Sequence, residues 1–161
     1  MLQIFFMQTA LLVVHSLLRW GVLLFGLWAV WNALAGVMGN RIWSANDKRS
    51  GLLFMTFCDI QLLIGLVLYF KGEWFGLLKD HFKETMQSPG NRFFAMEHMA
   101  MMILAWLLVH IGRSMVKKGR TDKSKHTRGL VFFGLALILI LVSIPWPFRA
   151  NIGRPWLHWF N

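Results

Sequence analysis

The sequence is poor in cysteine, in acidic residues and in charge of either sign. Its single cysteine, Cys58, excludes an intrachain disulfide and any CxxC redox pair. Only 7 of the 161 residues are acidic, and charged residues make up 15% of the chain. By contrast, 57% of the residues are hydrophobic, with 14 Phe and 9 Trp among them. This composition excludes a disordered chain and an ordinary soluble domain.

The apolar residues gather in four long blocks, at roughly 9–38, 51–70, 93–116 and 129–148. Each block has about 20 residues or more, enough to cross a hydrocarbon core of about 30 Å at about 1.5 Å per residue. Most connections between the blocks are short, which favours helices that alternate in direction. We therefore expect an all-α integral membrane protein whose single domain, residues 1–161, is a four-transmembrane-helix up-down-up-down bundle.

The segments outside the blocks carry their own patterns. No lysine or arginine precedes the first block, which is also too long for the apolar region of a signal peptide, so we expect a retained helix. The long connection, residues 71–92, has apolar residues at helical spacing, which predicts an interfacial helix on the outer side. The tail "GRPWLHWFN", residues 153–161, has the composition of an interfacial anchor.

The basic residues predict the orientation in the membrane. Ten of the 17 lysines and arginines lie in or beside the loops 39–50 and 113–128, and six lie in 71–92 and the tail, where acidic residues dilute them. The positive-inside rule then places both termini outside and the two basic loops in the cytoplasm. We expect the basic segment 113–128 to contact anionic lipid. The net charge of +10 could suggest a nucleic-acid partner, but the position of these charges in the membrane loops argues against one.

Among the polar side chains inside the apolar blocks, seven are candidates for a function. A charged group in hydrocarbon costs about 3 kcal/mol or more, so such residues face the bundle interior and often mark function. They are His15, Arg19, Asp59, Gln61, Glu97, His98 and His110. Counted from the outer surface at about 1.5 Å per residue, His15 and His98 lie about 9 and 8 Å deep, and Arg19 and Asp59 both lie about 15 Å deep.

The level positions of Arg19 and Asp59 predict an interhelical ion pair. An unpaired guanidinium in hydrocarbon is prohibitive, and Asp59 is the only acid at that depth. The pair could be a structural clasp that fixes helix register, or it could belong to a functional site. Arg19 could instead pair with a propionate of a bound cofactor, because it lies four residues from His15 on the same helix face.

The level positions of His15 and His98 predict a site for haem b. In an up-down bundle the first and third helices face each other on a diagonal, so the two imidazoles could hold the iron from both faces. The alternative is a structural role, in which each histidine only makes a hydrogen bond across a helix interface.

His110 fits this site less well. It lies twelve residues from His98, which places it about 120° around the helix. It could serve a proton path, a quinone headgroup or the lipid interface. The other histidines, His81, His126 and His158, fall in loops or the tail, where we expect solvated side chains.

Several strings resemble those of a group of small bacterial four-span membrane proteins catalogued as "cytochrome b-like". They are "HSLLRW", "DIQLLIGLVLYF", "RFFAMEHMAMMILAWLLVHIGR", "TDKSKH" and "IPWPFRANIGRPW", which together span nearly the whole chain. The resemblance implies an electron-transfer subunit of the bacterial inner membrane, with His15 and His98 as haem ligands and His110 as a weaker candidate. Members of that group carry a histidine near the position that Asp59 occupies in this chain. Because this chain departs from them there, the resemblance implies no haem ligand on the second helix.

Three functions are therefore open at the level of sequence. The leading hypothesis is a b-type haem protein that passes electrons between the quinone pool, or a membrane partner, and an acceptor outside. The second is a non-catalytic accessory subunit of a larger membrane complex or homo-oligomer, since the fourth block offers an apolar face without chemistry. The third is a proton- or quinone-handling protein without haem, acting through Asp59, His110 and Glu97. No residue is assigned a catalytic role, which favours an electron-transfer or accessory subunit over a stand-alone enzyme.

Overall fold

The computed structural model of the protein describes residues 2–158 and has the predicted all-α architecture. Four long helices form the bundle: α1 (Leu2–Met38), α2 (Ala45–Lys71), α6 (His98–Lys117) and α7 (Asp122–Ser143). Each of the four, α6 together with the residues just before it, is long and apolar enough to cross a membrane. The described part of the chain contains no strand.

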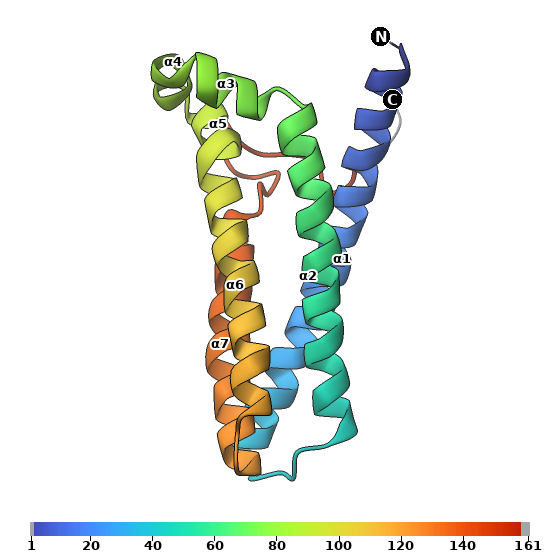
Figure 1. Cartoon of the computed structure of the whole chain (residues 1–161), viewed down its shortest axis with the longest axis vertical. Helices are drawn as coiled ribbons and strands as arrows, with labels where there is room; N and C mark the ends of the chain where they lie inside the picture. Colours follow the sequence, from blue (N-terminus) through green and yellow to red (C-terminus); the bar gives the residue numbers. More distant parts are fainter. Residues whose placement is uncertain (1, 159–161) are drawn as a thin grey trace.

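The four helices alternate in direction, as predicted (Figure 1). α1 packs against α2 and α7, and α6 packs against α7 and α2. This leaves α1 and α6 on one diagonal of the bundle and α2 and α7 on the other. The first and third spans therefore face each other across the interior.

The connection between α2 and α6 differs from the single interfacial helix predicted for residues 71–92. It forms three short helices, α3 (Trp74–Asp80), α4 (Phe82–Gln87) and α5 (Pro89–Arg92), followed by a π-helical turn, η1 (Phe93–Glu97). The breaks fall at His81 and Ser88, whose backbones leave the helical region. The three short helices cap one end of the bundle (Figure 1).

The boundaries of α2 and α7 also differ from the predicted spans. α7 covers 122–143 rather than 129–148, because the Thr121 side chain accepts from the Ser124 amide at 3.1 Å and Pro145 disfavours helix at the residue before it. α2 covers 45–71 rather than 51–70, because Ser44 and its partner Asp47 form a capping box that starts the helix within the polar stretch.

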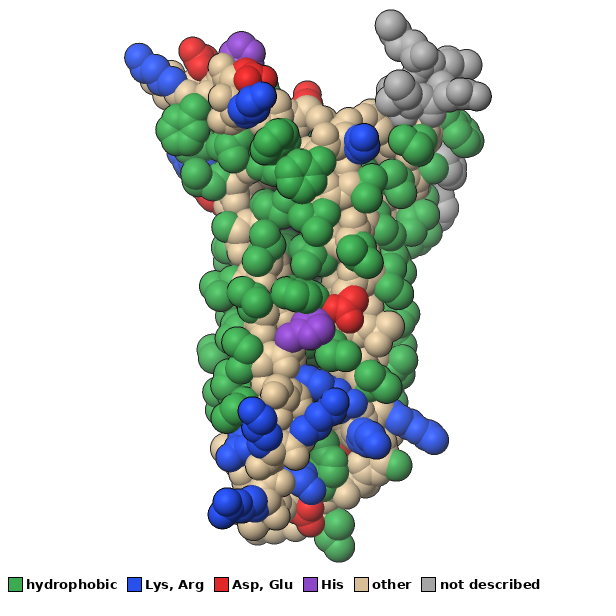
Figure 2. All heavy atoms as spheres, viewed as in Figure 1, with side chains coloured by type: hydrophobic (Ala, Val, Ile, Leu, Met, Phe, Trp, Pro, Cys, Tyr) green, Lys and Arg blue, Asp and Glu red, His purple; other side chains and the backbone are tan. Residues whose placement is uncertain are grey.

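The packed core lies in the half of the bundle nearer the α1–α2 and α6–α7 connections. Phe54, Val109, Phe133 and Ala136 have almost no exposed surface, and the rings of Phe54 and Phe133 meet edge to face. Figure 2 shows hydrophobic side chains in a belt across the visible face of the bundle and a group of lysine and arginine side chains at its lower end. The pairs α1–α2 and α6–α7 diverge towards the other end, where the candidate site lies (Figure 1).

Candidate functional site

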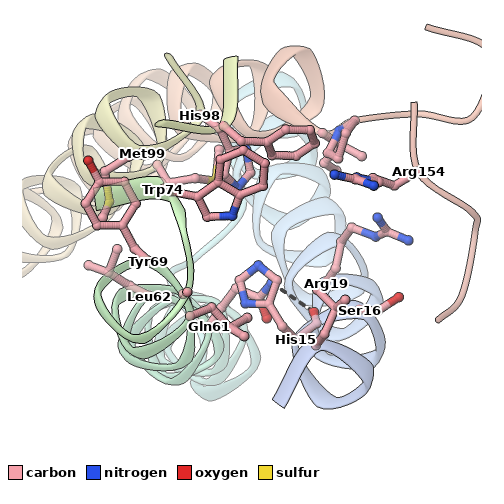
Figure 3. Close-up of a pocket in the computed structure, with 18 of the residues that line it drawn as sticks. His15, Ser16, Arg19, Gln61, Leu62, Tyr69, Trp74, His98, Met99 and Arg154 are labelled. Carbon is pink, nitrogen blue, oxygen red and sulfur yellow. Dashed lines mark hydrogen bonds between the residues drawn. The ribbon is translucent and has the colours of Figure 1, made fainter. Parts of the chain in front are cut away.

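A cavity of about 750 Å³ opens between α1, α2 and α6 at the end of the bundle that carries α3 to α5. Its size is in the range typical of small-molecule and cofactor sites, about 300–1,000 Å³. Most of the lining is apolar. The polar or aromatic members used below are His15, Ser16, Arg19, Gln61, Trp74, His98, Trp106, Arg154 and His158. Figure 3 shows how side chains from these elements surround the space.

His15 enters the cavity from α1 (Figure 3). Its ring lies against Gly65 of α2, where an added Cβ would be 3.2 Å from the Cε1 atom of His15. The Gln61 side-chain amide donates to the His15 carbonyl at 3.0 Å, which ties this turn of α1 to α2. The Nδ1 atom of His15 is buried and has no hydrogen-bond partner among the described residues. The imidazole is thus positioned by packing and retains unused bonding capacity.

His98 enters the same cavity from the start of α6, and its ring is held by a backbone carbonyl. Its Nδ1 lies 2.9 Å from the carbonyl oxygen of Ser143 on α7. Because a carbonyl only accepts, Nδ1 carries the proton, and Nε2 is left with a free lone pair. A hydrogen bond of this kind from the second nitrogen is typical of histidines that bind a metal.

The π-helical turn η1 directly precedes His98. The His98 amide bonds to the carbonyl of Phe93, five residues earlier, and the His98 ring lies near the rings of Phe93 and Phe94. Such a turn adds a residue to the helix, which rotates the residues before the turn relative to those after it. These turns are frequent at functional sites, and no pattern in the sequence revealed this one.

Arg19 also lines the cavity, beside a tail segment that folds back over the bundle. Its guanidinium donates to the carbonyl of Trp156, which also accepts from the indole of Trp20 at 3.3 Å. The His158 amide donates to the Ser16 hydroxyl at 3.2 Å, in the turn of α1 that carries His15. The tail thereby brings Arg154 and His158 to the cavity.

The predicted ion pair between Arg19 and Asp59 is wrong. The carboxylate of Asp59 faces α6, where Oδ1 accepts from Trp106 Nε1 at 2.6 Å and lies 2.7 Å from His110 Nε2. The depth estimate placed the two residues at one level but did not determine which way each side chain points around its helix. Arg19 meets the tail carbonyl instead, and its Nε atom is buried without a partner in the described residues.

His110 therefore lies apart from the other candidate ligands. It pairs with Asp59 and is absent from the lining of the cavity. Glu97, a candidate proton acceptor, pairs with Arg92 at 2.7 Å.

Two of the three remaining histidines are not the solvated side chains that we expected. His126 is completely buried in α7, and His158 is partly buried at the cavity. Only His81 is exposed. Residues 159–161 of the predicted anchor lie outside the described part of the chain.

The sequence reasoning missed the residues that the fold adds to the cavity. Trp74 comes from the short helix α3, Trp106 from α6, and Arg154 and His158 from the tail. The only available signal was the abundance of Trp, Arg and His in the tail, which is equally typical of an interfacial anchor.

The cavity offers two side-chain ligands for a metal rather than the three or more of a metal site built from protein ligands alone. No three His, Cys, Asp or Glu residues gather into a metal site among the described residues. A haem iron needs only two axial ligands, and the cavity offers two imidazoles. No protein-family model, curated protein or solved structure matches the chain.

Proposed function

We propose that the protein binds haem b in the cavity, where His15 and His98 would hold the iron, and transfers electrons. One observation carries the proposal: imidazoles from diagonal helices line one cavity, and the Ser143 carbonyl orients one of them as a metal-binding histidine is oriented. The haem supplies one-electron redox chemistry when bound.

The rest of the cavity fits the same group. Its mainly apolar lining would receive the macrocycle, and the contact between His15 and Gly65 shows how closely α2 approaches the ligand-bearing face of α1. The guanidinium groups of Arg19 and Arg154 would meet the propionates, because arginine binds carboxylates in a charge-assisted geometry. The unused Nε of Arg19 is consistent with this role.

The surroundings support placement in a bacterial inner membrane. Basic side chains gather at one end of the bundle (Figure 2), which under the positive-inside rule is the cytoplasmic end. Loops 39–50 and 113–128 would then face the cytoplasm, with 113–128 against anionic lipid, and the cavity would open near the outer face. The electron donor would be the quinone pool or another membrane subunit, and the acceptor would lie outside.

The proposal is tested by an absorption spectrum. The protein is expressed with haem supplied, purified in detergent and measured as the reduced-minus-oxidised difference. We expect a Soret band and an α-band in the unaltered chain and their loss in His15→Ala and in His98→Ala. The matched control is His81→Ala, which removes an exposed histidine and should keep both bands. An unaltered chain with native helical content, shown by circular dichroism, and without these bands would refute the proposal.

A further inference from the structure

A second polar cluster lies between α2 and α6, outside the cavity. Oδ1 of Asp59 accepts from the indole N–H of Trp106 at 2.6 Å and contacts Nε2 of His110 at 2.7 Å. The His110 and Trp106 rings lie 4.4 Å apart, centroid to centroid. Trp106 also lines the cavity, so the cluster and the cavity share one side chain.

The cluster is open to the surroundings of the bundle rather than sealed inside it. The side chains of His110 and Asp59 are 35% and 33% exposed. Nearby positions on the two helices hold exposed apolar residues, including Ile60, Leu63, Leu107 and Ile111. Figure 2 shows a histidine beside an acidic side chain within the hydrophobic belt.

Its position along α2 places the cluster deep in the apolar layer. Asp59 lies about 21 Å from Ala45 and about 18 Å from Lys71, at about 1.5 Å per residue. An acid and an imidazole exposed to hydrocarbon are costly unless a partner covers them.

The hydrogen bonds within the cluster determine what kind of partner fits. Trp106 only donates, so with an ionised Asp59 both recorded donors meet one carboxylate oxygen, Oδ1. With Asp59 ionised and His110 neutral, its proton on Nε2, the atoms that remain are Oδ2 of Asp59 and Nδ1 of His110. Both are then acceptors, and neither has a donor among the described residues. The cluster therefore has a surplus of acceptors facing an apolar medium.

We propose that the Asp59–His110 pair binds the hydroxyl-bearing head of a lipid-soluble quinol. A quinol has the donors that the pair lacks, reaches this depth from the lipid phase and carries no charge to desolvate. Its ring is suited to the aromatic surface of Trp106 and His110. The oxidised quinone, which has only acceptor oxygens, fits the same atoms poorly.

This inference deepens the proposed function, because it gives the quinone-pool donor a binding site, but binding at the pair does not require haem. Trp106 belongs both to the cluster and to the lining of the cavity, so it would connect the quinol to the haem if the cavity holds one. The binding experiment stands whether or not the haem spectrum is found.

The test measures binding of a short-chain ubiquinol analogue to the full-length protein in phosphatidylcholine nanodiscs. The amount of quinol retained by nanodiscs with protein, minus the amount retained by protein-free nanodiscs, is counted as bound. This measurement contains no haem-dependent step. We expect saturable binding, and at least about a tenfold weaker affinity in Asp59→Asn and in His110→Gln. The dimethyl ether of the same quinol, which lacks the donors, should show no saturable binding.

Matched variants separate this site from general effects. Glu97→Gln removes the acid paired with Arg92, and His81→Gln removes an exposed histidine. Both should bind quinol as the unaltered chain does. Circular dichroism and size-exclusion elution confirm that each variant is folded.

Three outcomes would overturn the inference. The first is no excess quinol on the unaltered chain. The second is an affinity for quinol in Asp59→Asn and in His110→Gln that equals the affinity of the unaltered chain. The third is a dimer that both variants dissociate and that shows no quinol binding, which would mean that a second copy covers the pair.

Discussion

His126 and Gly36 show how tightly single residues are fitted where α1 meets α7. His126 has no exposed surface, and neither ring nitrogen has a hydrogen-bond partner among the described residues. The ring lies directly on the backbone of Gly36, where an added Cβ would be 2.1 Å from Nδ1. Glycine is therefore required at this position for close approach, since the backbone conformation itself is helical.

We expect Gly36→Ala to destabilise the bundle by about 1–3 kcal/mol, because the new methyl group must displace a ring with no free space around it. The measurement is unfolding in mixed micelles with increasing denaturing detergent, followed by circular dichroism. Gly134→Ala is the matched control, because nothing lies within 4 Å of its added Cβ, and it should unfold no earlier than the unaltered chain. Equal stability of the two variants would contradict the packing described here.

At this scale the sequence predicted which residues are polar inside the membrane, but not all of their partners. Depth along each helix follows from a constant rise per residue, and His15 and His98 do share one cavity. Direction around the helix is sensitive to irregularities such as the π-helical turn before His98. Asp59 faces α6 from α2 and meets His110 rather than Arg19, a direction that depth alone does not determine.

At the scale of the elements, side chains satisfy backbone N–H groups at the N-terminus of α2. The Asp47 carboxylate accepts from the Ser44 amide at 2.8 Å, and the Ser44 hydroxyl accepts from the Asp47 amide. Asp47 also pairs with Arg41 at 3.2 Å. These contacts fix the short connection from α1 to α2.

We expect Ser44→Ala to cost about 1 kcal/mol of stability, the usual loss for an N-cap side chain. The same detergent unfolding experiment measures it. Ser114→Ala, which removes an exposed serine side chain from α6, should change stability by less than about 0.5 kcal/mol. A cost for Ser44→Ala no larger than that of the control would show that the cap contributes nothing.

The tail segment 144–158 is held to α1 by few contacts and carries a titratable group. Burial lowers the pKa of His158 below its ordinary value of 6.5, and the charges of Arg154 and Arg19 lower it further. The docked tail therefore favours neutral His158. Its docking is complete above pH 6.5 and weakens as the pH falls below that value, because the released histidine takes up a proton more readily.

A nitroxide label at Pro155→Cys, an exposed tail position, should therefore become more mobile as the pH falls from about 7.5 to about 5. Electron paramagnetic resonance measures the change. Adding His158→Gln should remove the pH dependence. Label mobility that responds to pH equally with and without His158 would assign the effect to another group.

The elements differ in how far the sequence determines them. The four long helices follow from block length and hydropathy alone, so the fold class was predictable. Their ends depend on local chemistry, such as the Thr121 cap and Pro145, and were shifted by several residues. The return of the tail to Ser16 and Arg19 depends on contacts between residues far apart in the chain, which no local pattern encodes.

For the whole molecule, the charge distribution makes a prediction about orientation. Gln87 and Thr127 are exposed residues at opposite ends of the bundle, and Cys58 is buried. In intact bacterial cells, an impermeant maleimide should label Gln87→Cys at once and Thr127→Cys only after the membrane is permeabilised. The unaltered chain, with Cys58 alone, should stay unlabelled. The reverse order of labelling would invert the topology.

The folded-back tail also constrains how the protein is made. Arg154 and His158 line the cavity, yet they are synthesised after all four long helices. The cavity is therefore incomplete until the tail has been synthesised and has folded back onto α1. Any ligand that needs the finished cavity can bind only after all four long helices have been made, so its binding depends on the tail reaching the bundle.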